Sequence, residues 1–468
     1  MKKENNPDMP GKKLGHPTEN HLFYIRPTDS LPLVDHAEGI YLYDKDGNRY
    51  IDGSSGPIAC NIGHADPRIQ QAMMEQASKV SFAYRTQFLN EPALRLSEKL
   101  ATLCPGTLDK VFFVSGGSEA IEAAIKVAHQ YHRERHEGTR WRVISRSPSY
   151  HGLTIGAMSC TGFRASKGAF DSYDLNFPKI NAPFCYHCPY GLTSDTCELN
   201  CLDELERIIL LYGPENISAF MAEPIGGAST GAIIPPDGYY ERAREICDTY
   251  GVLLIVDEVM TGFGRTGKFL AIDWWDVVPD IVVLSKGMSA GYTPLGAMVA
   301  KREIYDTIME GSGEFIHGHT YVGNPLSCAI GLKVIEIMEG DGLIENSRKL
   351  GEYLGAELRK LKDKHSIFGD VRGRGLFYGV EVVRDQQTKE PFPLASHPSE
   401  VLQRIAFDKG LIIYGSHYFT DDFYGDHFMV APPLTTNRAE IDELIAILDE
   451  SIKEFLPVLA DQLHEDAR

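Results

Sequence analysis

LLIVDEVMTGFGRTGKFLAIDWWDVVPDIVVLSKGMSAGYTPLGAM, at residues 253–298, is the stretch that decides the fold of this chain. Three apolar runs lie in or beside it, each bounded by turn residues: they are residues 252–256, 280–285 and 296–300. Continuous runs of this kind are typical of strands that are buried on both faces, as in a parallel sheet. Asp257 follows the first run and Lys286 the second. We therefore expect both side chains at the carboxyl ends of neighbouring strands, where open α/β sheets bind their ligands.

The same pattern continues on the N-terminal side of this stretch. Apolar runs at 110–114, 141–145 and 217–222 alternate with segments of helical periodicity. The helical segments are residues 118–135 and 236–251. Alternating strands and helices predict an α/β domain with a mostly parallel central sheet and flanking helices.

The two ends of the chain have a different pattern. Residues 33–53 predict two short strands around the turn Asp46-Gly47. After residue 330 the sequence predicts a long helical segment, a glycine-marked strand and a closing helix. We therefore expect a smaller α+β domain built from both chain ends. The expected division is a flexible arm at 1–20, small-domain segments at 21–60 and 346–468, and a large domain at 61–345.

Composition excludes several classes of protein. The 468 residues include 46 Lys and Arg against 65 Asp and Glu, a net charge of −19, which argues against nucleic-acid binding because phosphates need a basic surface. No run approaches the roughly 20 apolar residues that cross a membrane. The polar N-terminus lacks the apolar core of a signal peptide, and nine cysteines, an odd number, favour reduced thiols. These features predict a cytoplasmic protein.

Four of the cysteines lie close together in CYHCPYGLTSDTCELNC, residues 185–201. They are Cys185, Cys188, Cys197 and Cys201, with His187 between the first two. The spacing leaves two interpretations open, a small structural zinc loop or free thiols. No metal is expected in the catalytic machinery.

A glycine-rich turn precedes the first predicted helix in VFFVSGGSEAIEAA, residues 111–124. Gly117 and Ser118 stand where a strand passes directly into a helix. Free N–H groups and the positive end of the helix dipole suit one phosphate group there. An ordinary strand-to-helix turn with Ser118 as the N-cap is the alternative.

Asp257 and Lys286 each allow a plain structural interpretation as well. The carboxylate could cap a helix or form a salt bridge, and the lysine could lie on a surface loop. Together with the phosphate-binding turn, however, they supply what pyridoxal phosphate needs. A desolvated lysine can bind the aldehyde, and an aspartate can keep the pyridine nitrogen protonated.

Here the sequence resembles the class III pyridoxal-phosphate aminotransferases, the ω-aminotransferase family of fold type I. The resemblance rests on residues 253–298 and on further motifs in the same order along the chain. These are SGGSEAIEAAIKVA at 115–128, SYHG at 149–152, MAEPI at 221–225, HGHTYVGNPLSCA at 317–329 and VRGRGLFYGVEV at 371–382. It covers nearly the whole chain from about residue 35.

The resemblance implies roles around the cofactor ring. Lys286 is implied as the Schiff-base lysine and as the base that moves the proton between substrate and cofactor. Asp257 would pair with the pyridine nitrogen. Val259 and Tyr150 would pack on the two ring faces.

It also implies a phosphate site shared between subunits. Gly117 and Ser118 would bind the phosphate from one chain and Thr320 from its neighbour. A homodimer then becomes part of the mechanism, and whether dimers pair into tetramers stays open.

Substrate contacts follow from the same resemblance. Glu223 would lie near the substrate, with a structural salt bridge as the alternative, and Arg438 would clamp a substrate carboxylate. Gly226 and Ile58 depart from the glutamine and tryptophan of many members. Further residues expected along the pocket wall are Ile58, Tyr84, Arg85 and Phe88.

The function predicted from these residues is transamination. An amino group would pass from an ω-amino acid or primary amine to pyruvate or 2-oxoglutarate through pyridoxamine phosphate. An aminomutase or racemase on the same scaffold is the alternative. A non-catalytic binding protein would not need the lysine, the aspartate and the phosphate-binding turn together.

Overall fold

The computed structural model describes residues 21–23, 31–163, 168–193, 196–419 and 424–465. The arm expected at 1–20 lies outside them. At the centre is a seven-stranded sheet in the order β4-β10-β9-β8-β7-β5-β6. Its strands are β4 (Leu108–Val114), β5 (Arg142–Ser147), β6 (Lys179–Asn181), β7 (Ile217–Ala222), β8 (Leu253–Asp257), β9 (Ile281–Leu284) and β10 (Gly296–Lys301).

The sheet is mostly parallel, as expected, with one reversed strand. Strands β5 to β9 pair in parallel, whereas β10 is antiparallel to both β9 and β4. The apolar run at 296–300 forms the reversed strand β10, and the prediction of a mostly parallel sheet is confirmed. Only a short connection separates β9 from β10, and a parallel crossover needs about a dozen residues or more, usually with a helix.

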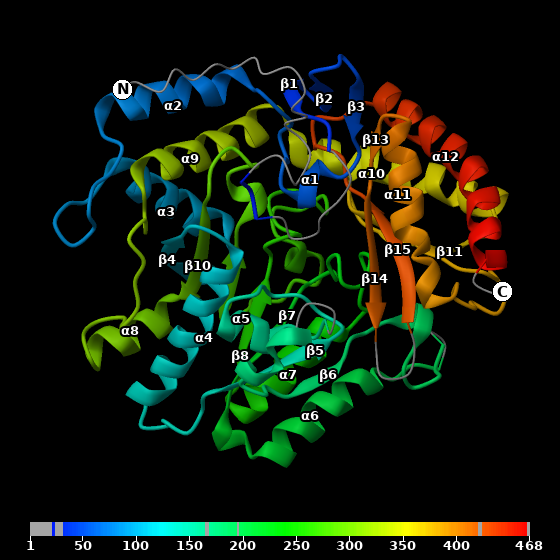
Figure 1. Cartoon of the computed structure of the whole chain (residues 1–468). Helices are drawn as coiled ribbons and strands as arrows, with labels where there is room; N and C mark the ends of the chain where they lie inside the picture. Colours follow the sequence, from blue (N-terminus) through cyan, green and yellow to red (C-terminus); the bar gives the residue numbers. More distant parts are fainter. Residues whose placement is uncertain (1–20, 24–30, 164–167, 194–195, 420–423, 466–468) are drawn as a thin grey trace.

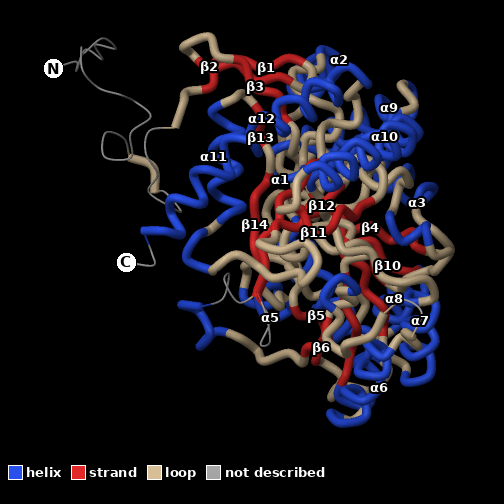
Figure 2. Tube along the Cα trace, turned by 90° about the vertical axis from the view of Figure 1, so that its right-hand side faces the viewer, coloured by secondary structure: helices blue, strands red, loops and turns tan. Residues whose placement is uncertain are grey.

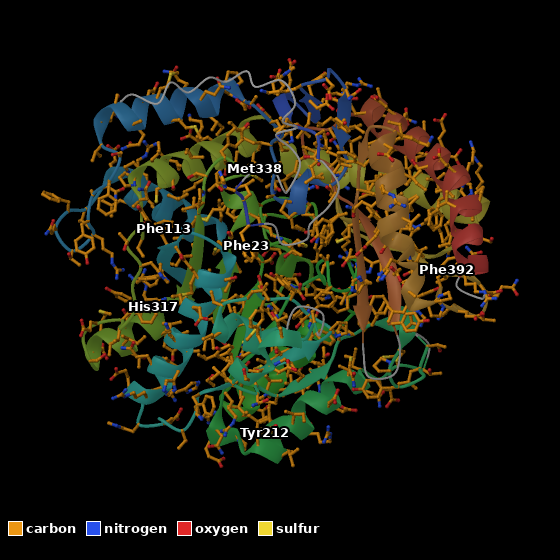
Figure 3. The ribbon with its side chains drawn as sticks, in the orientation of Figure 1. Phe23, Phe113, Tyr212, His317, Met338 and Phe392 are labelled. Atoms are coloured by element: carbon orange, nitrogen blue, oxygen red, sulfur yellow. The ribbon has the colours of Figure 1, made fainter. Side chains whose placement is uncertain are left out.

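Burial on both faces explains why the central strands are continuously apolar. In β8, Ile255 belongs to one core, while Leu254 and Val256 belong to the core on the opposite face. Helix α4 packs on the face of Ile255. The larger core, on the other face, extends to Phe113 of β4 and to Met338, both labelled in Figure 3.

Helices connect and cover these strands. The predicted segments 118–135 and 236–251 correspond to α4 and α7 within a few residues. The helices of this part of the chain are α2 (Pro67–Lys79), α3 (Glu91–Leu103), α4 (Gly117–Glu134), α5 (Ile155–Cys160), α6 (Asn200–Tyr212), α7 (Tyr239–Tyr250), α8 (Arg302–Glu310) and α9 (Pro325–Gly340).

Both ends of the chain meet in one small sheet of order β1-β2-β3-β13. Strands β1 (Val34–Glu38), β2 (Tyr41–Asp44) and β3 (Arg49–Asp52) follow one another, so residues 33–53 form three strands instead of the two expected. Asp44 stabilises the β2–β3 turn by accepting hydrogen bonds from the backbone of Asp46 and Asn48. Strand β13 (Leu411–Ile412) then pairs in parallel with β3.

A third sheet, of order β11-β12-β15-β14, is antiparallel and comes from the C-terminal part of the chain. The glycine-marked segment forms two of its strands. The elements are α10 (Leu343–Lys364), β11 (Phe368–Gly373), β12 (Tyr378–Val382), α11 (Pro398–Asp408), β14 (Tyr414–Phe419), β15 (Tyr424–Val430) and α12 (Arg438–Glu465).

Figures 1 and 2 show β1–β3 beside β13 and α12 at one end of the molecule, and α6 at the opposite end. The division into domains at residues 60 and 345 stays a prediction. Within the described residues, no helix has both the length and the apolar character needed to cross a membrane.

Candidate active site

A cavity of about 410 Å³ lies where several strands of the central sheet end. Lys286 lies two residues beyond the end of β9. Asp257 is the last residue of β8, and Glu223 directly follows β7. The structure brings together seven of the residues expected from the sequence. They are Gly117, Ser118, Tyr150, Glu223, Asp257, Val259 and Lys286.

Lys286 is the one lysine, with no arginine beside it, among the described residues that line this cavity. Burial lowers the pKa of its amine to about 8, while the negative charges of Asp257 and Glu223 act in the opposite direction. Its backbone has φ of 42°, a left-handed conformation that is uncommon for a residue with a side chain. A sizeable fraction of the amine is therefore neutral and nucleophilic near neutral pH.

Asp257 is held in place by two hydrogen bonds. Its Oδ1 accepts from the backbone N–H of Val259 at 3.0 Å, and its Oδ2 lies 2.8 Å from Nδ1 of His151. Only 4% of Asp257 is exposed. The sequence analysis missed His151, although it directly follows Tyr150 in the SYHG motif.

The amino end of α4 forms one wall of the cavity through Gly117 and Ser118. Two residues here are glycines because neighbouring side chains lie too close to leave room for a Cβ atom. A Cβ on Gly152 would lie 2.2 Å from the Ser118 hydroxyl oxygen, and one on Gly117 would lie 3.0 Å from Val259. Free N–H groups at the start of an 18-residue helix, which has no side-chain cap hydrogen bond, are suited to an anion.

Glu223 is fixed in the cavity by its surroundings. The backbone N–H of Gly227 donates to its carboxylate at 3.0 Å, and Arg146 and Tyr240 donate to its backbone carbonyl. Burial raises the pKa of the Glu223 carboxyl group, and the positive charges of His151 and Arg146 partly oppose this. Among the described residues Glu223 forms no salt bridge, since Arg146 contacts its carbonyl and not its carboxylate.

Several further residues line the cavity and were not found from the sequence, among them Pro57, Phe163, Tyr414 and Ser416. Tyr414 and Ser416 are two residues apart on β14, so both side chains face the same side of this strand. No local motif marks them, since a strand far along the chain brings them to the site.

The sequence and the fold can now be compared with known proteins. A family model described as Aminotransferase class-III matches residues 24–452. The chain belongs to the class III aminotransferases. An uncharacterized aminotransferase of Bacillus subtilis, YodT, is 43% identical over 92% of this chain and 97% of its own length.

Solved aminotransferases share the whole fold. A thermostable (S)-enantioselective omega-transaminase from Thermomicrobium roseum matches with a TM-score of 0.87 and 36% identity, covering 93% of this chain and 96% of that one. An amine transaminase from an uncultivated Pseudomonas species, in its PLP-bound form, matches with a TM-score of 0.86 and 32% identity, covering 95% and 99%. The architecture is therefore that of the fold type I transaminases.

Class III aminotransferases depend on pyridoxal phosphate, and the cavity of this aminotransferase fits that cofactor. The amino end of α4 suits the phosphate, and Asp257 is a buried carboxylate that suits the pyridine nitrogen. His151 has its Nδ1 on Asp257, whereas its buried Nε2 has no hydrogen-bond partner among the described residues. The amine of Lys286 is available for the aldehyde.

Other predicted residues lie outside this cavity of the aminotransferase. Ile58 is only 1% exposed and packs in the core, so the neighbouring Pro57 forms the cavity wall in its place. Tyr84 and Arg85 line a separate hollow of about 660 Å³ together with Thr320. Within one chain, these residues are therefore not part of the lining of the cavity that holds Lys286.

Arg438 also lies away from the cavity lining. Arg438 is the first residue of α12. Its guanidinium carbon lies 4.3 Å from the ring centre of Tyr353, a residue of α10. The structure gives no support to the prediction that Arg438 clamps a substrate carboxylate, because the side chain would first have to leave this ring.

The cysteine segment does not form a metal cage in this structure. All four cysteines of residues 185–201 are free thiols. Among the described residues, a single group of three metal-ligand side chains was found, and it is at Asp52, Cys60 and His64 instead. The zinc-loop interpretation of residues 185–201 therefore gains no support.

Proposed function

We propose that this aminotransferase moves an amino group from an ω-amino acid or a primary amine to a keto acid, pyruvate or 2-oxoglutarate. The observation that carries the proposal is a lysine of lowered pKa in a cavity that also holds Asp257, Glu223 and the amino end of α4. The solved relatives described as omega-transaminase and amine transaminase support the choice of donor.

Bound pyridoxal phosphate supplies an electron sink for the negative charge that develops on the substrate carbon. Lys286 would be the base that accepts the proton from the substrate. Asp257, which is oriented by His151 and by the N–H of Val259, would hold the pyridine nitrogen in its protonated form. Tyr150 and Val259 would pack against the ring.

The substrate side of the cavity favours an amine. Its walls include the apolar side chains of Pro57, Phe163 and Ile225, and the carboxyl group of Glu223 stands among them. Among the described lining residues there is no arginine. A primary-amine donor carries no carboxylate and therefore needs no arginine clamp in this cavity.

A panel of donors and acceptors tests the function. The purified enzyme is given primary amines and ω-amino acids, with pyruvate run against 2-oxoglutarate, and the new amino acid is measured. Lys286→Ala should lose at least about a thousandfold in rate, because it removes the proton-transferring base. Lys360→Ala, an exposed lysine of α10, serves as the matched control.

The same panel separates transamination from its alternative. An aminomutase or racemase converts its substrate without a separate keto acid. Product formation that does not depend on added keto acid would replace the proposal with that alternative. Turnover by Lys286→Ala at the original rate would remove the catalytic assignment altogether.

We further propose a homodimer in which Thr320 completes the phosphate site of the neighbouring subunit. Thr320 is exposed and faces a hollow separate from the cavity of its own chain. A groove of about 780 Å³ nearby is lined by Val80, Phe82, Tyr84, Phe88 and Leu89, all of them exposed apolar side chains. Apolar patches of this kind are typical of subunit interfaces.

Mixed dimers test the shared site. Thr320→Ala and Lys286→Ala chains, each weakly active alone, are unfolded and refolded together. If Thr320 acts across the interface, each hybrid dimer holds one intact site, with Lys286 from one chain and Thr320 from the other. Activity should then rise well above the sum of the parents. No rise, or a monomeric mass in light scattering, contradicts the shared site.

A further inference from the structure

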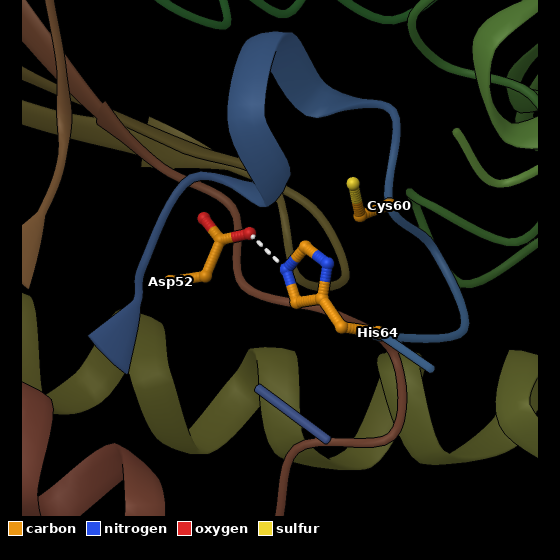
Figure 4. A group of neighbouring side chains, drawn as sticks. All are labelled: Asp52, Cys60 and His64. Carbon is orange, nitrogen blue, oxygen red and sulfur yellow. Dashed lines mark hydrogen bonds and ion pairs between the residues drawn. The ribbon is translucent and has the colours of Figure 1, made fainter. Parts of the chain in front are cut away.

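Three side chains with metal-binding atoms meet just outside the cavity. Asp52 ends β3, and Cys60 and His64 lie in the segment that follows. Their ligand atoms all lie within 4.8 Å of one another. Figure 4 shows the ring of His64 between the carboxylate of Asp52 and the thiol of Cys60. None of the three lines the cofactor cavity, so the proposed transamination does not use them.

Asp52 is well placed to hold a cation. It is 2% exposed, and its Oδ1 accepts hydrogen bonds from the backbone N–H groups of Ser54 and Gly56, both at 3.2 Å. Its Oδ2 points at His64, whose Nε2 lies 3.0 Å away. The local backbone therefore fixes the carboxylate and leaves one oxygen directed toward the other two side chains.

The nearby cationic side chain, Arg265, does not bind the Oδ2 atom of Asp52. Arg265 is buried close to the cluster, and its charge acts on Asp52 and Cys60. Its N–H groups, however, donate to the backbone of Leu376 and Pro432 and to the side chains of Ser55 and Asn61. The carboxylate of Asp52 therefore has His64 as its ionic partner among the described side chains.

We propose that Asp52, Cys60 and His64 bind one zinc ion. Oxygen, nitrogen and sulfur donors together suit zinc better than the harder calcium or magnesium ions. Tetrahedral zinc ligands lie about 3.3–3.8 Å apart, given bonds of about 2.0–2.3 Å. The His64 Nε2–Asp52 Oδ2 distance of 3.0 Å would therefore open by about 0.3 Å, and a separation at the 4.8 Å limit would close by about 1–1.5 Å. Three protein ligands leave a fourth position for water.

The ion replaces a proton already present in the cluster. It takes the place of the thiol proton of Cys60 and interrupts the hydrogen bond between His64 and Asp52. Because ligands must lose protons before they bind, zinc affinity should rise with pH. His64 and Cys60 are both partly exposed, so the ion can reach the site from solvent.

The position of the site gives the ion a structural effect. Asp52 and Cys60 flank the loop whose middle residue Pro57 lines the cavity. Binding would tie the two ends of this loop together. The metal would therefore hold one wall of the substrate cavity in place without taking part in the chemistry.

Zinc titration of the holoenzyme tests the proposal. The enzyme is freed of metal with a chelator, given zinc in competition with a chromophoric chelator, and analysed for zinc after gel filtration. We expect one zinc per chain, and an affinity at least about tenfold higher at pH 7.5 than at pH 6.5. Cys60→Ser and His64→Gln should each weaken binding at least about a hundredfold.

Cys188→Ser is the matched control, because Cys188 is also a partly exposed thiol but lies in the 185–201 segment. It should keep full zinc affinity. The absorbance of bound cofactor shows that each variant is folded. Zinc that persists in Cys60→Ser and is lost in Cys188→Ser would place the metal in the other segment and overturn the proposal.

Cobalt gives a second readout that does not depend on affinity. Cobalt(II) bound to a thiolate absorbs in the near ultraviolet, and the difference spectrum on adding cobalt isolates this band from the cofactor. The band should appear in the original enzyme and in Cys188→Ser, and be absent in Cys60→Ser. Its absence from the original enzyme, or no bound zinc at pH 7.5, would overturn the site.

Discussion

Glu258, the residue after Asp257 at the end of β8, is a fully buried carboxyl group whose ionisation should control part of the stability. Its carboxylate accepts hydrogen bonds from the Thr261 hydroxyl at 2.5 Å and from the backbone N–H of Ile272 at 2.8 Å. Burial nevertheless raises the pKa of Glu258 from 4.5 to about 7, because these hydrogen bonds only partly replace the lost hydration.

The sign of the effect follows from proton linkage. Between pH 4.5 and 7 the folded chain holds a proton on Glu258 that the unfolded chain has lost. Stability from this group is therefore complete below pH 4.5 and is lost as pH rises through 7. The rise from 4.5 to about 7 corresponds to about 3 kcal/mol, since one pKa unit is worth about 1.4 kcal/mol. Between pH 5 and 8 the loss is about 2–3 kcal/mol.

Glu258→Gln removes this dependence and keeps the packing. The amide can accept from Ile272 N–H and donate to the Thr261 oxygen, so no buried polar atom is left without a partner. We expect the free energy of unfolding of the variant, minus that of the original, to increase by about 2–3 kcal/mol from pH 5 to 8. Other titrating groups cancel in this difference.

Urea unfolding at pH 5, 6, 7 and 8 measures the effect, with tryptophan fluorescence as the signal and the same slope applied to both proteins. Glu241→Gln, at an exposed glutamate in the first turn of α7, is the control and should show a constant difference. If the curves of Glu258→Gln and the original enzyme stay parallel over this range, the carboxyl group is ionised throughout and the reasoning is refuted.

Three further predictions concern the cofactor and substrate. The rate at which the cofactor-free enzyme takes up pyridoxal phosphate, followed by absorbance, should rise about tenfold from pH 6 to 7 and level off above pH 8. Only neutral Lys286 attacks the aldehyde, and the pKa of this lysine is about 8. A rate that does not change with pH contradicts this prediction. Gly152→Ala should weaken cofactor affinity at least about tenfold in equilibrium dialysis, because its φ of 122° is unfavourable for alanine and its Cβ would press on Ser118. Arg438→Ala should leave the KM for keto acids within about twofold, because its guanidinium stacks on Tyr353 outside the cavity; a large increase would show that the arginine moves to the substrate.

Local patterns in the sequence determined the central sheet and the core of the site. Six apolar runs correspond to six of the seven strands of the central sheet, because strands buried on both faces are mainly apolar. Asp257 is a charged residue at the end of one such strand, β8, and Lys286 lies two residues beyond the end of another, β9. A polar residue at the end of a buried strand points to the sheet edge, so the sequence alone placed both in one site.

The tertiary structure decided what depends on contacts between distant segments. The reversed direction of β10 follows from its pairing with β4 and β9, and the walls at Tyr414 and Ser416 follow from how β14 lies over the sheet. The partner of Asp257 proved to be His151, 106 residues away in the chain. Periodicity reports which side of an element is buried, whereas packing decides which other element lies there. For that reason Lys286 and Asp257 could be predicted from the sequence, whereas only the fold showed which residues surround them.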